Sequence, residues 1–113
     1  MSSTTRSEPF AQLAVIRPLP GHEQEVEKQL GSLVEAARTE PGTLVYVMHR
    51  RERAGGGVEF VFYEVFASKE SFEVHAASAT MAAFVEQAEG LLDGGISVER
   101  LEFVAGTTGT LPA

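Results

Sequence analysis

The chain has 113 residues, a formal net charge of −7 at pH 7 and no cysteine. This length suits one domain with its own core, and the lack of cysteine excludes disulfide bonds and thiolate chemistry. The acidic balance opposes nucleic-acid phosphates, and no apolar stretch is long enough to span a membrane, so we expect a cytoplasmic protein that binds neither nucleic acid nor membrane.

The first half of the chain predicts a strand, a helix and a second strand. Phe10–Arg17 is rich in apolar residues and is followed by prolines, as expected of a strand. In Glu23–Arg38 the apolar residues recur at helical spacing, and Pro41 stops the helix because it has no amide hydrogen to donate. Thr43–Arg50 is the second strand, and a glycine-rich turn follows it.

The third predicted strand, Phe60–Ala67, is apolar on both faces. Such a strand needs a cover on each face, but the chain supplies helices for one layer only. We therefore expect the second face to meet the sheet of another copy of the chain, which predicts a homodimer. Alternation places Phe60, Phe62, Glu64 and Phe66 on one face and Val61, Tyr63, Val65 and Ala67 on the other.

The last part of the chain predicts a broken helix and a fourth strand. Ser68 is suited to cap a short helix over Lys69–His75. A second helix follows, with an apolar stripe from Met81 to Leu92, and Ile96–Val104 predicts the last strand.

The order of these elements is strand, helix, strand, strand, broken helix, strand. With right-handed crossovers, this order predicts a ferredoxin-like α+β sandwich, in which helices cover one side of a four-stranded antiparallel sheet. We expect this domain at residues 10–105, between a flexible N-terminal segment at 1–9 and a C-terminal tail at 106–113. Pairing of two such sheets would give a dimeric α+β barrel.

Two sequence strings carry a family resemblance: PGTLVY from Pro41 to Tyr46, and YEVFASKESFEVH from Tyr63 to His75. With the element order, they resemble the antibiotic biosynthesis monooxygenase (ABM) domain family over roughly Phe10 to Val104. The resemblance implies a dimeric barrel with a pocket in each subunit between sheet and helices. Some members of the family oxidise phenols and quinols with molecular oxygen and without metal, flavin or haem, so it implies no cofactor and no metal.

The chain also departs from the family pattern. Phe66 stands at the family tryptophan, and Phe62 and Phe72 stand where the polyketide-oxidising branch places an asparagine and a tyrosine. The haem-degrading branch uses an asparagine, a tryptophan and a histidine together, and this sequence has no asparagine and no tryptophan. Haem degradation by that mechanism is therefore not expected.

Two residues are candidate catalytic groups. Glu64 lies between Phe62 and Phe66 on one strand face, and an apolar setting raises a carboxyl pKa and makes the group a useful base. A buried strand carboxylate can instead be a structural partner of backbone or arginine. His75 matches the family histidine and could move protons, or it could simply cap the end of its helix.

A second set of residues is suited to holding a flat aromatic ligand, although the same residues would equally form an ordinary core. Tyr46 and Tyr63 can each donate a phenolic proton, and we expect Tyr63 at the dimer seam. His22 stands near two glutamates at a helix start, which we interpret as a solvated helix end rather than a metal site. The candidate substrate-binding residues are Phe62, Phe66, Phe72, Ala14 and Ile16.

The leading functional hypothesis is a cofactor-independent monooxygenase that acts on a small aromatic, such as a quinol or a polyketide phenol. One alternative is a non-catalytic module of the same fold that binds a small ligand, because phenylalanines occupy positions where polar site residues are expected. Another is a small-molecule isomerase, since one scaffold supports several chemistries.

Overall fold

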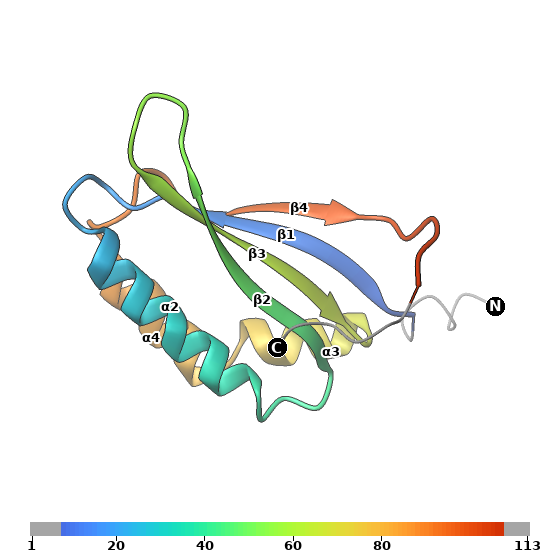
Figure 1. The fold of residues 1–113 in the computed structure, drawn as a ribbon. Coiled ribbons are helices and arrows are strands. Elements are labelled where there is room, and N and C mark those ends of the chain that lie inside the picture. The colour runs from blue at the N-terminus through green and yellow to red at the C-terminus, as the bar shows by residue number, and fades with distance from the viewer. Residues whose placement is uncertain (1–7, 108–113) are drawn as a thin grey trace.

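The computed structural model describes residues 8–107, and residues 1–7 and 108–113, which make up most of the two expected terminal segments, lie outside the described residues. It confirms the ferredoxin-like α+β fold: an antiparallel sheet in the order β2-β3-β1-β4, with the helices on one face (Figure 1). The elements are β1 Phe10–Ile16, α2 Glu23–Ala37, β2 Thr43–Glu52, β3 Val58–Phe66, α3 Lys69–Ala76, α4 Ala79–Gln87 and β4 Ser97–Leu101.

Two elements are shorter than the sequence predicts. Helix α4 ends at Gln87, and β4 stops at Leu101. The apolar residues Leu91 and Leu92 suggested a longer helix, but they pack against the core from an irregular turn instead. This turn is fixed to the end of β1 by a hydrogen bond from the Leu19 amide to the Leu91 carbonyl (2.8 Å) and by a bridge between Pro18 and Leu92. Tertiary contacts therefore bury the two leucines without helical geometry.

The core lies between the sheet and the helices. Phe60 and Phe62 of β3 are 1 % exposed, and they face Leu30 of α2 and Phe84 of α4, which are 0 % and 2 % exposed. Full burial of each such side chain contributes about 1.5–3 kcal/mol to folding. The predicted helical stripe of α2 thus covers the phenylalanine face of β3.

The opposite face of the sheet carries small and medium apolar side chains. Val61 and Val65 of β3 lie there, and Leu13 of β1 pairs with Tyr63 on the same face. The helices in the described part of the chain all lie on the other side (Figure 1). Within residues 8–107, no helix is both long and apolar enough to cross a bilayer.

Candidate functional site

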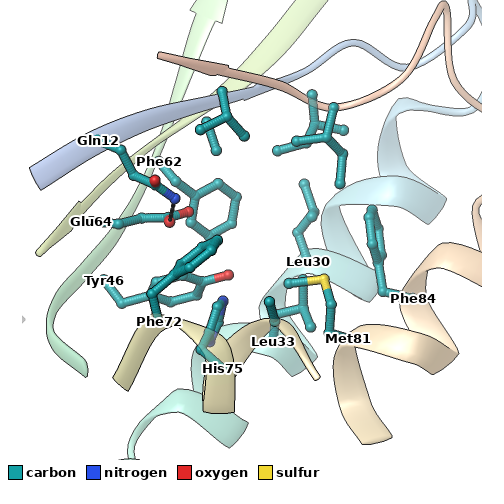
Figure 2. A pocket seen from close by; sticks show the side chains of 15 residues that line it. Gln12, Leu30, Leu33, Tyr46, Phe62, Glu64, Phe72, His75, Met81 and Phe84 are labelled. Carbon is teal, nitrogen blue, oxygen red and sulfur yellow. Dashed lines mark hydrogen bonds between the residues drawn. The ribbon is translucent and has the colours of Figure 1, made fainter. Parts of the chain in front are cut away.

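A cavity of about 200 Å³ lies between the inner face of the sheet and the helices. Its wall is mostly apolar, and it includes two partly exposed residues at β4, Ile96 and Val98, which are 37 % and 54 % exposed. Figure 2 shows that the polar side chains gather at one end, opposite an apolar end formed by α2 and α4. The residues at the polar end include Gln12, Tyr46, Glu64, Phe72 and His75, and those at the apolar end include Leu30, Leu33, Met81 and Phe84.

Glu64 lies at the polar end, on β3, and is 4 % exposed. Gln12, its partner across β1 and β3, donates a hydrogen bond from Nε2 to Glu64 Oε1 (2.8 Å; Figure 2). Burial raises the pKa of Glu64, because the charged form loses its hydration, while the Gln12 hydrogen bond and the nearby His75 oppose this rise. Once ionised, the carboxylate is therefore a stronger base than an ordinary surface glutamate.

His75 lies on α3 beside the cavity and is 4 % exposed. Its Nδ1 lies 2.8 Å from Glu40 Oε1, in the loop between α2 and β2. Ser68 caps α3 as the sequence predicts, since its side chain accepts a hydrogen bond from the Ser71 amide (3.1 Å). The His75 side chain thus bonds to a carboxylate, whereas the alternative interpretation placed it on helix carbonyls.

Tyr46 of β2 completes the polar end. Its ring meets that of His75 edge to face, with centroids 4.9 Å apart, and packs on Phe62 at the same distance. Burial, followed by the charges of Glu64 and Glu40, raises the pKa of Tyr46 far above its ordinary value. Tyr46 therefore keeps its proton at physiological pH and can donate a hydrogen bond.

Four of the five residues expected to bind an aromatic ligand line the cavity, namely Ala14, Ile16, Phe62 and Phe72. Phe66 does not line it. This residue is fully buried, and its ring packs against those of Phe72 and His75, each with centroids 5.3 Å away. Phe66 therefore supports the side chains that face the cavity.

The sequence interpretation missed several lining residues. Gln12 had a signal, because it is the polar member of an inward-facing series that otherwise consists of Phe10, Ala14 and Ile16. Its Oε1 is buried and has no hydrogen-bond partner among the described residues. The residues at the apolar end had no such signal, because helix positions that face a cavity hold the same apolar residue types as helix positions that face a packed core. The other lining residues outside the predicted site are Leu30, Leu33, Tyr46, Ala76, Met81, Phe84, Ile96 and Val98.

No cluster of three or more histidine and acidic side chains with metal-binding geometry occurs within residues 8–107. His22 lies 3.6 Å from Glu25 at the start of α2, with 42 % and 58 % of the two side chains exposed. This pair belongs to a solvated helix end.

A four-stranded antiparallel sheet with helices on one face and a pocket between the two layers defines a small ferredoxin-like α+β domain. The sequence profile of the antibiotic biosynthesis monooxygenase family matches residues 9–87, which is most of the chain. The protein therefore belongs to the antibiotic biosynthesis monooxygenase (ABM) family, as the sequence strings around Pro41 and Tyr63 indicated. A search of curated protein sequences finds no match.

Solved structures share this fold. Rv0793 from Mycobacterium tuberculosis is 25 % identical, with a TM-score of 0.78 over 89 % of this chain and 100 % of that one. PA3566 from Pseudomonas aeruginosa is 27 % identical, with a TM-score of 0.77 over 88 % and 98 %. A structure described as an antibiotic biosynthesis monooxygenase is 22 % identical, with a TM-score of 0.75 over 85 % and 99 %, and at that identity it supports the fold alone.

Proposed function

We propose that the protein is a cofactor-independent monooxygenase of the cytoplasm that oxidises a small aromatic hydroxyl compound, such as a quinol or a polyketide phenol, with molecular oxygen. The observation that carries this proposal is the pairing of an apolar cavity with two buried ionisable side chains at one end, Glu64 and His75. Membership of the ABM family supports the reaction class.

The proposed chemistry needs a base and a dry pocket. Removal of the hydroxyl proton by Glu64 or His75 makes the ring electron-rich, so that the substrate itself reduces oxygen. A carbon–oxygen bond forms at a ring carbon that bears hydrogen, giving a hydroperoxide. The O–O bond then breaks, that carbon loses its hydrogen, and a carbonyl and one water result. A phenol with one O₂ thus gives a quinone and one water, and the ring supplies all four electrons.

The cavity limits the size and orientation of the substrate. An apolar cavity of about 150 Å³ can hold benzene, so the volume of about 200 Å³ suits one ring with substituents or a compact pair of rings. The polar end would receive the hydroxyl group, with Tyr46 as donor and Glu64 as acceptor, while the apolar end would receive the remainder of the ligand (Figure 2). Phe62 and Phe72 offer aromatic surfaces between these ends.

We further propose that the working unit is a homodimer paired through the outer face of the sheet. This face carries apolar side chains on the two central strands, including Leu13, Val61 and Val65, beside the carboxylate of Glu59 and its partner Arg17. The described helices leave this face without a cover (Figure 1), and an apolar sheet face without a helical layer suits a second sheet. A second copy offers the same surface, as a twofold interface requires.

Oxygen uptake tests the enzymatic proposal. The purified protein is given mono- and bicyclic quinols and phenols, and oxygen consumption is followed together with product formation. We expect consumption of one O₂ per ring oxidised, and a decrease in kcat of about 10²–10⁴-fold in His75→Ala with KM nearly unchanged. Glu86→Gln, on the exposed side of α4, is the control and should retain full activity.

Two results would overturn this proposal in favour of the alternatives. Saturable binding of the same compounds without oxygen consumption would indicate a non-catalytic binding module. Conversion of a substrate to an isomer under nitrogen, at the rate seen in air, would indicate an isomerase.

A further inference from the structure

The contact between Glu40 and His75 joins two distant segments inside the protein. The residues are 35 positions apart, their side chains are 14 % and 5 % exposed, and Oε1 lies 2.8 Å from Nδ1. An ionised carboxylate can only accept hydrogen bonds, so the hydrogen of this contact resides on Nδ1. In the neutral ring, Nε2 then keeps its lone pair.

The plane of the His75 ring is also fixed. Tyr46 packs against it at 64° and Phe66 at 46°, with centroids 4.9 Å and 5.3 Å away. Figure 2 shows a ring nitrogen of His75 directed toward the cavity, on the side of Tyr46. The carboxylate and the two aromatic rings therefore determine both the tautomer and the direction in which the ring points.

Glu40 is itself held by a tight turn after α2. Its amide donates to the Ala37 carbonyl (3.0 Å), and its Oε1 accepts a second hydrogen bond from Thr43 Oγ1 (2.7 Å). Gly42 of the same turn is so close to α3 that an added Cβ would lie 2.4 Å from Ser71 Cβ. Ser71 lies one helical turn before His75, so this close approach fixes the distance from Glu40 to the histidine.

We propose that Glu40 is a positioning residue that holds His75 in the Nδ1–H tautomer, so that Nε2 faces the ligand as a proton acceptor. This inference rests on the proposed function for its catalytic consequence. Glu40 does not line the cavity. It acts through His75, in the way that a carboxylate orients the histidine of a hydrolase triad. The proton taken from the substrate hydroxyl goes to Nε2, and the imidazolium so formed is stabilised by the carboxylate behind it.

The test combines nitrogen NMR with steady-state kinetics on Glu40→Ala and Glu40→Gln. In the native protein, the ¹⁵N shifts of neutral His75 should show hydrogen on Nδ1. Glu40→Ala removes the acceptor, so the tautomer should move toward Nε2–H and kcat should fall about 100-fold, with a much smaller change in KM. Glu40→Gln keeps a side-chain oxygen in place, so it should retain the native tautomer. Its kcat should be at least about tenfold higher than that of Glu40→Ala.

Glu35→Gln is the matched control, because Glu35 lies near Glu40 in the sequence, at the end of α2, and its exposed carboxylate pairs with exposed Arg38 (3.2 Å). It should leave both tautomer and kcat unchanged.

An unaltered His75 tautomer in Glu40→Ala would overturn the proposal, and so would an altered tautomer with native kcat. If the native protein oxidises none of the compounds while Glu40 still sets the tautomer, the proposed function fails and the positioning role stands. Should Glu40→Ala not fold, Glu40→Met, which keeps the side-chain length but has no oxygen to accept the hydrogen bond, takes its place in the same NMR comparison.

Discussion

Gln12 and Glu64 are direct cross-strand partners on β1 and β3, and the Gln12 amide donates a 2.8 Å hydrogen bond to the Glu64 carboxylate inside the core. This bond stabilises the charged form of a group that burial otherwise disfavours. The two opposing effects leave the pKa of Glu64 raised, with burial the larger. The folded state therefore holds the Glu64 proton more tightly than the unfolded state.

The first prediction concerns stability against pH in Glu64→Gln. As pH rises from the ordinary glutamate range through the raised pKa of Glu64, the folded protein should lose stability, because the unfolded chain releases the proton first. Glutamine has no charge to bury and can still accept the bond from Gln12. The melting temperature of Glu64→Gln should thus equal or exceed that of the native protein at pH 8, and the difference should shrink toward pH 4.

This comparison also separates two roles of Glu64. A large drop in melting temperature at pH 8 in Glu64→Gln would show that the ionised carboxylate is architectural and would contradict the prediction. Glu52→Gln, an exposed change at the end of β2, is the control and should show no such pH-dependent difference.

The second prediction concerns the ionisation of Tyr46. The chain has two tyrosines, so Tyr63→Phe leaves Tyr46 as the single phenol. Because burial and the charges of Glu64 and Glu40 raise its pKa, the phenolate absorbance of Tyr63→Phe should stay absent through the ordinary tyrosine range and appear only when the protein unfolds in alkali. Titration in the ordinary tyrosine range, with the far-UV circular dichroism still native, would show that the hydroxyl is not buried as described.

The third prediction concerns the turn that holds Glu40. The backbone of Gly42 does not have a positive φ, so alanine is disfavoured there by space alone, with an added Cβ lying 2.1 Å from Ser71 Oγ. Gly42→Ala should lower the free energy of unfolding by about 1–3 kcal/mol in denaturant titration. Ser71→Gly removes both clashing atoms, so the double variant should lose less than the sum of the single changes.

Gly31→Ala is the control for this substitution. Gly31 lies within α2, and an added Cβ there would meet no atom within 4 Å. Alanine should stabilise the helix by about 0.5–1 kcal/mol. Strict additivity of the Gly42 and Ser71 changes would rule out the contact between the turn and α3.

The fourth prediction concerns association. Leu13→Glu places a charge on the outer face of the central strand β1, where a second copy is proposed to pack, and should weaken a dimer about 100-fold or more. Val85→Glu places the same charge on α4, at a side chain that is 57 % exposed, and should leave association unchanged. Sedimentation of both variants over a range of concentrations makes the comparison. A native protein that sediments as a monomer throughout that range would exclude the dimer.

The sequence predicted the main elements because the spacing of apolar residues along each helix or strand follows the burial of their side chains. The alternation of Phe60–Ala67 predicted a strand that is apolar on both faces, and the structure places it as β3 between β1 and β2. The end of α4 was not predictable in the same way. Leu91 and Leu92 continue the helical spacing, yet they lie in the turn after α4. Hydrogen bonds join this turn to the end of β1, so the two leucines are buried outside the helix.

The site was predictable in part for a similar reason. Glu64 stood out as one carboxylate on a phenylalanine face, and His75 stood out through the family strings. The partner of His75 was not visible, because nothing local links Glu40 to a residue 35 positions later. Only the fold brings the α2–β2 turn against α3. Phe62 and Phe66 show a second limit of the sequence pattern. They alternate on the same strand face, and this alternation does not reveal that the Phe62 ring faces the cavity whereas the Phe66 ring is buried behind it.

The division of the cavity into two ends has an evolutionary consequence. The groups proposed to handle protons are carried by the strands, by α3 and by the turn before β2, whereas Leu30, Leu33, Met81 and Phe84 come from α2 and α4. Substitutions on those two helices can reshape the accommodated ligand while the acid–base apparatus keeps its geometry. Under the proposed function, ligand selectivity would thus change one helical side chain at a time while the proposed reactive groups stay in place.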